Sequence, residues 1–521
     1  MRLDMYDDQV VRQSDIGHHL FLDQGSLGKN RSEECCRMLK EVARSKGRDS
    51  PWIDGNDFLL DRDHYEGIDE FEGFWGWSAF ICVRLNSEAE QVTSRYCWDF
   101  YVPAIFVQTC GLVARIRLQI REHSVIQIHP NSLMDLRLDC PFPSLSEFVK
   151  SFEMDKIDSG ERANVPAVVI VIHFLELFKS KHCGIPPLNS AGKAELKEMI
   201  LAEKQNDNEK NFDEAVDLIE KACQPTKVPR HIEELFNDPQ CDKIPWFNGK
   251  FWVLVRSLRE FVKTSPTHQL PLSGALPEMK TDTKNNIKMR SIYYQQALED
   301  LERFKEIVDE MTESVEEEYE GRPQEYTEDF KHWLVPPELD ISPEMVKSFA
   351  ENSAHIRVVR GSRLGQDPKD LIPQFVKECQ PGNEEYHATW YVAFEAMAAY
   401  RSKREGKYCY LAGHEGEYPG MRKDQEDGDL HALWKFSLGW LNSRRWAAPR
   451  DDQEQEIIPQ KLQKVLKEMI RLAGSELPHI GSMTGGLVSQ EVIKLITGQY
   501  IPTNGVCIYD GYQSMTRVLE F

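Results

Sequence analysis

The strictest alternation of apolar and polar residues in the chain runs from Ala114 to Arg121. The odd and even positions separate into two sets, Ala114, Ile116, Leu118 and Ile120 against Arg115, Arg117, Gln119 and Arg121. A period of two is typical of a β-strand that turns one face to the core and the other to solvent. We therefore predict a half-buried strand here.

The residues before this strand predict an α/β region. Helical spacing is found in two segments and short apolar runs in two others: helices over Leu27–Val42 and Ser87–Phe100, strands over Trp77–Leu85 and Pro103–Val107. Strand–helix–strand order is typical of parallel βαβ units. Two prolines within Asp139–Pro143 block both helix and sheet, so we expect this α/β region to end near residue 155.

Helical periodicity dominates from residue 156 to residue 455. In Ser291–Val315 the apolar residues recur at steps of three and four: Tyr294, Ala297, Leu301, Phe304, Val308, Met311 and Val315. This seam suits a helix packed inside its own domain, which we favour, or a short coiled coil. The segments 360–386 and 403–430 are rich in Gly, Pro and charge, and predict loops. The β-branched residues of Val165–Ile172 favour a strand, but the resemblance described below implies a helix, which we adopt.

The C-terminal residues return to an α/β pattern. One apolar stripe predicts a helix over Ile457–Leu472: Leu462, Val465, Met469 and Leu472. Gly485 and Gly486 are expected to begin the next helix, where they would leave free N–H groups and room for another backbone. Two strands follow a Pro502–Gly505 turn, Val506–Tyr509 and Met515–Phe521. Four residues are candidates for a demanding turn or an interface: Gly485, Gly486, Gln490 and Glu491. Packing within the α/β core is the slightly favoured alternative for them.

Composition narrows the class of protein. A chain of 521 residues is too long for one ordinary domain, and about three are expected. The net charge of -22, from 85 acidic and 63 basic residues, argues against nucleic-acid binding, since phosphate binding needs a basic face. Twelve cysteines without a C-x-x-C pair indicate reduced thiols. The N-terminus has no apolar signal core, and the longest apolar run is too short to span a membrane.

The sequence lacks the usual catalytic signatures. Neither G-x-G-x-x-G nor G-x-x-x-x-G-K-[ST] occurs, so no phosphate-binding loop is predicted. G-x-S-x-G and H-E-x-x-H are also absent. His414-Glu415 is a lone His beside a carboxylate on a polar loop and is interpreted as a surface pair. His18-His19 is not expected to share a metal, because adjacent side chains on an extended segment point to opposite faces. We therefore predict no catalytic, cofactor-binding or metal-binding residue in this chain.

Several stretches, taken in order, resemble one protein family. They are Asp15–Glu33, Gly111–His123, Asp135–Pro143 and Gly485–Phe521, with weaker support from Ile232–Asp238, Leu270–Met279 and Asn352–Arg360. Together they resemble the regulatory, non-catalytic subunits of neddylation-activating enzymes, which belong to the ubiquitin-activating type. The likeness spans Asp7 to Phe521 and is faint in 185–225 and 363–455.

The resemblance implies a Rossmann-like pseudo-adenylation domain of the ThiF/MoeB type. Residues 1–155 and 456–521 would be its two parts, and 156–455 a large, mainly helical insertion resembling a catalytic-cysteine half-domain without the catalytic cysteine. The strand near Asp4–Val10 would follow a missing first βαβ unit. Family members begin with an arginine-rich segment and a first strand that this chain lacks, so we expect the chain as written to fold poorly alone.

The resemblance also implies that ATP and magnesium are held by a partner. Where the catalytic half carries Asn-Arg-Gln-Phe, this chain has His18-His19-Leu20-Phe21, and a neutral His and a Leu cannot replace an arginine and an amide at phosphate. Leu85-Asn86-Ser87 stands where the catalytic half has a magnesium-binding Asp. The catalytic subunit would adenylate the modifier and take it as a thioester.

The expected partners are the catalytic subunit, in a heterodimer, and the ubiquitin-like modifier of the neddylation pathway, with no nucleic acid or membrane. The expected location is the cytoplasm and nucleus. Three alternatives stay open: a non-enzymatic binding module for ubiquitin-like proteins, the regulatory subunit of a SUMO-type activating enzyme, and a self-sufficient adenylating enzyme. The last would need the glycine-rich loop that is absent.

Overall fold

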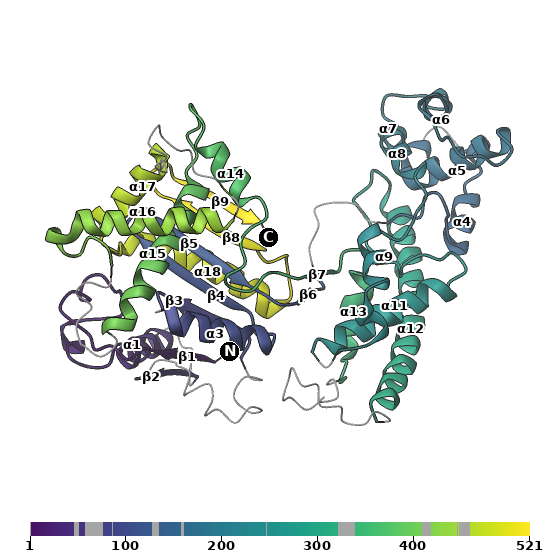
Figure 1. Cartoon of the computed structure of the whole chain (residues 1–521). Helices are drawn as coiled ribbons and strands as arrows, with labels where there is room; N and C mark the ends of the chain where they lie inside the picture. Colours follow the sequence, from purple (N-terminus) through teal and green to yellow (C-terminus); the bar gives the residue numbers. More distant parts are fainter. Residues whose placement is uncertain are drawn as a thin grey trace. The chain divides into compact units, whose positions relative to one another are not determined.

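The computed structural model of the chain describes residues 2–45, 52–57, 77–85, 87–127, 135–157, 161–245, 247–320, 339–408, 418–444, 446 and 459–520. The chain divides into two compact units (Figure 1). The sheet unit comprises Met1–His123, Val359–Thr497 and Ile501–Phe521. The helical unit comprises Ser124–Val358 and Gly498–Tyr500.

The sheet unit is built on a five-stranded mixed sheet in the order β3-β4-β5-β8-β9. Its strands are β3 (Phe80–Val83), β4 (Ala104–Cys110), β5 (Val113–Gln119), β8 (Gly505–Asp510) and β9 (Met515–Glu520). β3 and β4 are parallel and are joined by α3 (Ser87–Asp99), whereas the remaining neighbours are antiparallel. The mixed α/β class, the parallel βαβ unit and the C-terminal hairpin are confirmed.

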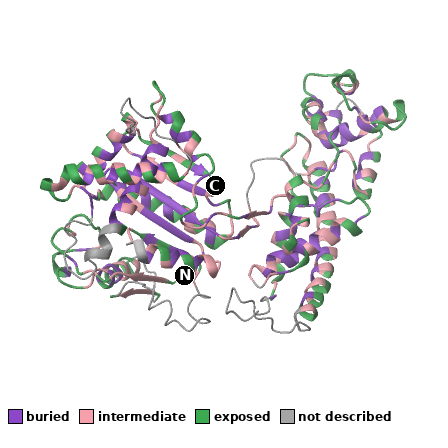
Figure 2. Cartoon of the chain, in the orientation of Figure 1, coloured by how far each residue is buried: buried purple, intermediate pink, exposed green. Residues whose placement is uncertain are grey.

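Helices cover the two faces of this sheet unequally. One face carries α3 and four later helices: α14 (Leu371–Glu378), α15 (His387–Tyr408), α16 (Glu426–Ser443) and α17 (Gln460–Leu472). The opposite face carries α18 (Pro478–Thr497), which packs on β4 and β5. Its buried cluster joins Ile105, Ile116 and Leu118 to Val488 and Leu495 of α18 and, within the described residues, includes no other helix. Figure 2 shows this buried layer through the centre of the sheet.

The prediction that β5 is half-buried is wrong. All seven of its residues are buried, and the side chains of Arg115 and Arg117 are themselves inside. Arg115 donates to Glu395 of α15 at 2.6 Å, and Arg117 donates to the carbonyl oxygen of Arg363 at 2.6 Å. Gln119 exchanges hydrogen bonds with Ser94 of α3. The polar face therefore meets polar partners from distant parts of the chain, because a buried charge must be paired.

A smaller sheet lies at the N-terminal end of the sheet unit. β1 (Leu3–Tyr6) and β2 (Ile53–Asn56) pair in parallel beside α1 (Arg31–Ser45), which begins four residues later than expected. No residue of either strand is fully buried. Neither strand is hydrogen-bonded into the five-stranded sheet. The proposed absence of a first βαβ unit stays a prediction.

The helical unit contains the other helices of the described chain. They are α4 (Pro143–Lys150), α5 (Ala167–Lys181), α6 (Ser190–Ala202), α7 (Lys210–Asp217), α8 (Ile219–Ala222), α9 (Arg230–Phe236), α10 (Pro239–Asp242), α11 (Gly249–Thr264), α12 (Thr283–Glu320) and α13 (Pro343–Glu351). Two buried apolar clusters hold them, one around α5 and one around α11 and α12. The chain enters and leaves through β6 (His123–Val125) and β7 (Arg357–Val359), which form a two-stranded sheet. The helix adopted for Val165–Ile172 is confirmed as part of α5.

α12 confirms the long helix, and corrects one member of its seam. Phe304, Val308 and Val315 are buried as predicted, but Tyr294 is 57% exposed and its neighbour Tyr293 is fully buried. The seam is therefore displaced by one residue in the first turns. α12 packs on α11 and α13 within its own unit, which is the alternative favoured over a coiled coil.

The compact units do not share the boundaries proposed at 155/156 and 455/456. The helical unit begins earlier, at Ser124, and ends earlier, at Val358. The loop prediction for 360–386 is wrong in part, because α14 lies there, and α15 extends to Tyr408 within the second predicted loop. These helices join the sheet unit because their aromatic side chains, such as Phe375 and Phe394, pack with α17.

The eleven cysteines among the described residues are all free thiols, in agreement with the expected reduced state. None of the described helices has both the length and the apolar composition needed to cross a membrane.

Candidate functional site

The carboxyl ends of parallel strands are where open α/β sheets bind ligands. At this edge Arg84 directly follows β3, with a φ of 51° in the left-handed region. Its Nε donates to Tyr418 Oη at 3.0 Å, Nη2 donates to the Gly474 carbonyl oxygen at 3.1 Å, and Nη1 pairs with Glu476 at 2.8 Å. All three nitrogens of the guanidinium are thus engaged by the chain itself.

Tyr418 contributes further contacts at the end of β3. The guanidinium groups of Arg84 and Arg401 each lie 4.8 Å from the centroid of its ring. A Cβ atom at Gly474 would come within 2.4 Å of the same ring, so a glycine is required there. Burial alone would lower the pKa of Arg84, but Tyr418 and Glu476 raise it above its ordinary value. The group stays charged and paired, and it occupies the end of β3.

The segment expected to have lost phosphate contacts lies in the same unit. The His19 ring is 3.7 Å from Cys35 Sγ, and burial, followed by the charge of Arg31, lowers its pKa. Leu20 is 88% exposed. A neutral imidazole and an exposed aliphatic side chain offer phosphate no fixed positive donor. Asn86, proposed to replace a magnesium ligand, lies outside the described residues.

No metal centre emerges from the part of the chain that the structure describes. It contains no group of three or more His, Cys, Asp or Glu side chains arranged to hold an ion. His414-Glu415 lies outside the described residues, so its interpretation as a surface pair stays a prediction.

Gly485 and Gly486 do not begin a helix, contrary to the prediction. They lie inside α18, which begins at Pro478, a residue favoured in the first helical turn. A buried stripe of Ile480, Thr484 and Val488 continues the helix through the glycines. That burial offsets a cost of about 1 kcal/mol for each glycine relative to alanine. A Cβ at either glycine would meet no atom within 4 Å, so this chain does not need a glycine there.

The other two candidate residues differ from each other. Gln490 is exposed on the surface of α18. Glu491 is partly buried, accepts a hydrogen bond from the Thr503 amide at 2.7 Å and pairs with Lys494 at 2.7 Å. Glu491 therefore fixes the turn that follows α18, while Gly485, Gly486 and Gln490 are presented to solvent.

The outer surface of α18 is nearly uncharged and exposes three large apolar side chains. Leu487 is 37%, Ile493 53% and Ile496 46% exposed. The charged residues of the helix are Glu491 and Lys494, which neutralise each other. On the same side of the sheet, β3 exposes Ile81 by 48% and Val83 by 57%. Both pair in register with buried residues of β4 on that side, Ile105 and Val107. We call this surface the α18 face: Ile81, Val83, Gly485, Gly486, Leu487, Gln490, Ile493 and Ile496.

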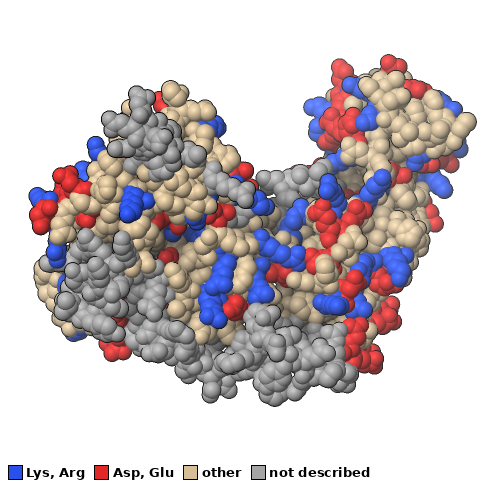
Figure 3. All heavy atoms as spheres, in the orientation of Figure 1, with Lys and Arg blue, Asp and Glu red and all other residues tan. Residues whose placement is uncertain are grey.

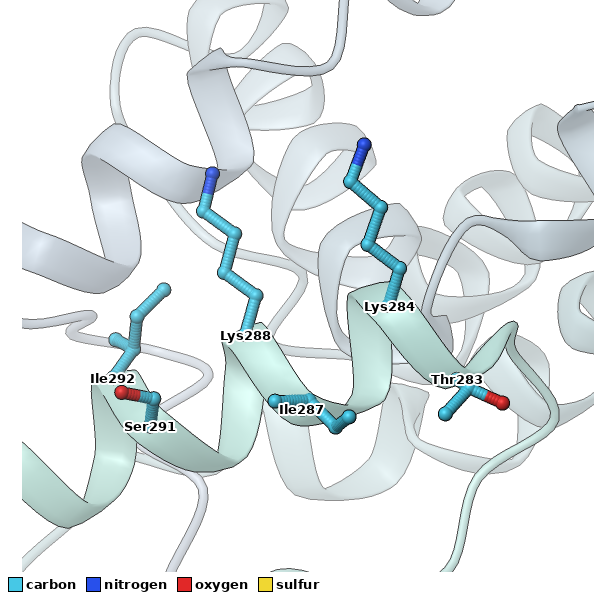
Figure 4. Close-up of a pocket in the computed structure, with 6 residues that line it drawn as sticks. All are labelled: Thr283, Lys284, Ile287, Lys288, Ser291 and Ile292. Carbon is cyan, nitrogen blue, oxygen red and sulfur yellow. The ribbon is translucent and has the colours of Figure 1, made fainter.

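The helical unit presents a different surface along the first turns of α12. An open groove of about 790 Å³ is lined by Thr283, Lys284, Ile287, Lys288, Ser291 and Ile292 (Figure 4). Lys288 Nζ lies 5.1 Å from the ring centroid of Phe148. The lining contains no acid, histidine or cysteine. Elsewhere on this unit, cationic and anionic side chains are interspersed (Figure 3).

The five-stranded sheet and its helices define a mixed α/β protein that exposes apolar side chains on α18 and β3. Comparison with known proteins shows which proteins this chain resembles. The chain is 28% identical over 518 residues to the NEDD8-activating enzyme E1 regulatory subunit of Xenopus laevis, covering 97% of this chain and 87% of that protein. It is 28% identical over 523 residues to the same subunit of Drosophila melanogaster, covering 99% and 87%.

The similarity extends to plants and in part to yeast. The NEDD8-activating enzyme E1 regulatory subunit AXR1 of Arabidopsis thaliana is 25% identical over 518 residues, covering 99% of this chain and 87% of AXR1. The subunit of Saccharomyces cerevisiae matches over 250 residues, 44% of this chain. No protein-family model matches the chain. The resemblance found in the sequence is confirmed: this chain is a homologue of the regulatory subunits of NEDD8-activating enzymes.

Proposed function

We propose that this chain is the regulatory subunit of a heterodimeric enzyme that activates NEDD8, a ubiquitin-like modifier. The observation that carries the proposal is similarity to subunits of that name over 97–99% of the chain in animals and plants. The names of these relatives favour neddylation over a SUMO-type system or an isolated binding module. In this function the chain supports adenylation and thioester formation carried out by a catalytic partner subunit.

We further propose that the chain has no adenylating activity of its own. Arg84 and its partners Tyr418 and Glu476 support this, because they occupy the end of β3 where the fold would bind a ligand. His19 and Leu20 support it too, since neither supplies a fixed charge to phosphate. ATP and magnesium would then bind in the partner. The sheet unit is interpreted as a Rossmann-like pseudo-adenylation domain, acting in the cytoplasm and nucleus.

A thioester assay tests both statements. The chain is mixed with the catalytic subunit of a NEDD8-activating enzyme, NEDD8 and ATP–magnesium, and the thioester is followed on non-reducing gels. We expect thioester only when both subunits are present. The chain alone should give no NEDD8-dependent exchange of pyrophosphate into ATP. Thioester formation that is unaffected by adding the chain would contradict the regulatory function, and exchange by the chain alone would contradict the second statement.

A further inference from the structure

We propose that the first turns of α12 bind an acidic peptide segment that also carries an apolar side chain. The surface consists of exposed residues, which we call the α12 patch: Lys284, Ile287, Lys288, Arg290, Ser291 and Tyr294. It belongs to the helical unit alone, so it does not depend on how the sheet unit is placed. The inference goes beyond the proposed function, because it assigns a binding surface that requires no catalytic partner.

Two open grooves meet on this part of α12. The first, of about 790 Å³, contains Lys284 and Lys288, whose side chains leave the helix on the same side (Figure 4). The second, of about 570 Å³, is lined by Arg290 and by residues 274–276, among others. Ser291 lines both grooves. A ligand lying over Ser291 would therefore have a groove on each side of it.

The three cations of the patch are available to a ligand. Within the part of the chain that the structure describes, no carboxylate pairs with Lys284, Lys288 or Arg290. The neighbouring Lys280, by contrast, pairs with Glu214 at 3.7 Å. Neither groove is lined by an acid. In a chain with 85 acidic and 63 basic residues, this surface is a local reversal of charge that suits a negatively charged ligand.

The order of charges along α12 favours a binding role for the cations over a stabilising one. The helix dipole favours acids in the first turn and bases in the last. The first turn of α12 contains no acid and its last turn no base, and Lys284 itself lies in the first turn. The charged residues of 306–320 are all acids. The dipole therefore disfavours Lys284 in the free protein, whereas the same positive helix end attracts an anion.

The apolar residues of the patch indicate that the ligand is more than a charge. Ile287 is 63% and Tyr294 57% exposed. With 3.6 residues per turn, both lie on the helix surface between the lysines on one flank and Arg290 on the other. A ligand that pairs with cations on both flanks would cover these two side chains. An apolar side chain of the ligand at this point would remove them from water, which is favourable.

Spacing and net charge together favour a short acidic peptide as the occupant. Lys284 and Lys288 are one turn apart, about 6 Å along the helix axis, and side chains two residues apart on an extended peptide are separated by about 6.7 Å. A nucleic acid or an anionic membrane would extend beyond the patch and meet a chain of net charge -22. A second copy offers the acidic end of its own α12, but whole copies repel each other at that charge. A short peptide pairs with the patch alone.

The first experiment measures binding of labelled peptides to the whole chain by fluorescence anisotropy. The probe is Glu-Glu-Leu-Glu-Glu-Phe-Glu-Glu with an N-terminal fluorescein. One control peptide has glutamine in place of every glutamate, and a second has alanine in place of the leucine and the phenylalanine. We expect the probe to bind at least tenfold more tightly than the glutamine peptide and at least threefold more tightly than the alanine peptide. Its affinity should fall as the salt concentration rises.

The second experiment locates the binding by removing charge. The double variant Lys284→Gln/Lys288→Gln loses two cations of the patch. Its control, Lys197→Gln/Lys227→Gln, loses two exposed lysines elsewhere in the helical unit that also lack an ion pair within the described residues. We expect at least fivefold weaker binding of the probe for the first variant and less than a twofold change for the second. Thermal melts verify that both fold.

The apolar contact is tested in the same way with Ile287→Ala. Ile185→Ala is the matched control, because Ile185 is also an exposed isoleucine of the helical unit, at 55%. We expect at least threefold weaker binding of the probe for Ile287→Ala and less than a twofold change for Ile185→Ala.

Each contrary outcome overturns the inference. Equal affinity for the glutamate and glutamine peptides would do so, as would unchanged binding by Lys284→Gln/Lys288→Gln. Co-sedimentation with phosphatidylserine vesicles that this variant abolishes, without peptide binding, would assign the patch to a membrane. A dimer in sedimentation that the variant dissociates, again without peptide binding, would assign it to self-association. None of these results bears on the thioester assay, which tests the proposed function separately.

Discussion

At the scale of single residues, Arg84 shows how one side chain can fill a position that the fold reserves for ligands. Its three nitrogens bind a phenol, a carbonyl and a carboxylate contributed by Tyr418, Gly474 and Glu476. We predict that Arg84→Ala lowers the free energy of unfolding by about 2 kcal/mol, because a charged hydrogen-bonded group is lost and the buried Tyr418 and Gly474 lose its hydrogen bonds. Urea denaturation measures this change.

Arg95→Ala is the matched control for that variant. Arg95 also pairs with a carboxylate, that of Asp99, but its side chain is 70% exposed and the distance is 3.7 Å. Exposed ion pairs of this kind contribute about 0.5 kcal/mol or less. Equal losses of unfolding free energy for the two variants would show that the hydrogen bonds of Arg84 do not stabilise the sheet unit.

Also at the residue scale, the stability of the fold is predicted to depend on pH through Glu34. Hydrogen bonds from Arg37, above all, together with Ser26 and the nearby charge of Lys29, lower its pKa to about 2. A carboxyl group with a lowered folded-state pKa stabilises the fold above its unfolded pKa and loses that contribution as pH falls through the folded one. We therefore expect the stability difference between the unmodified chain and Glu34→Gln to be full near neutral pH and to vanish between about pH 4.5 and pH 2.

The same denaturation series, repeated at several pH values, measures this difference. Glu41→Gln serves as the control, because Glu41 pairs with the same arginine but its side chain is 56% exposed. A difference for Glu34 that stays constant down to pH 2 would contradict the described hydrogen bonds.

At the scale of elements, α12 shows that helical spacing alone does not determine which residues are buried. Phe304 is fully buried between the rings of Phe261 and Phe349, whose centroids lie 6.2 and 6.1 Å away. We predict that Phe304→Ala costs about 3–5 kcal/mol of stability. Tyr294→Ala, at a position that the sequence pattern places in the same seam, should change stability by about 0.5 kcal/mol or less, because Tyr294 is 57% exposed. Calorimetric melts compare the two variants. Similar losses of stability would show that Tyr294 packs in the seam as predicted.

The elements also show which parts of the fold a sequence can reveal. Short-range patterns identified β3, α3, β4, α17 and the terminal hairpin, since each is encoded by apolar residues within the element. The burial of Arg115 and Arg117 was not foreseeable, because the groups that receive them, on α15 and at Arg363, are more than 200 residues away in sequence. Arg84 was missed for the same reason, since Tyr418 and Glu476 follow it by several hundred residues.

α18 illustrates a signal that was present but misread. Gly485 and Gly486 suggested a helix start, although Pro478 and the stripe through Ile480 and Thr484 indicated an earlier one. The candidate residues of the interface were consequently chosen for a turn that does not exist. Gly485, Gly486 and Gln490 nevertheless lie on the exposed side of the helix, while Ile493 and Ile496 were overlooked because exposed isoleucines cannot be recognised from sequence alone.

At the scale of the whole molecule, the two units differ in how the chain builds them. The sheet unit needs three separate stretches of sequence, and β5 pairs with β8 across nearly 400 residues. The helical unit is almost continuous, from Ser124 to Val358. A large sequence separation raises the entropic cost of forming contacts and slows folding. The helical unit can therefore acquire its structure before the sheet unit is complete.

This difference leads to a prediction for fragments of the chain. Both buried clusters of the helical unit, around α5 and around α11 and α12, consist entirely of residues between 124 and 358. We expect a fragment of residues 124–358 to fold alone, with helical circular dichroism and a cooperative thermal melt. A fragment of residues 1–123 should give no cooperative melt, because its strand β5 loses its neighbour β8 and the covering helices α15 and α18. A fragment 124–358 that melts without cooperativity and binds a hydrophobic dye would mean that the helical unit depends on the sheet unit for its packing.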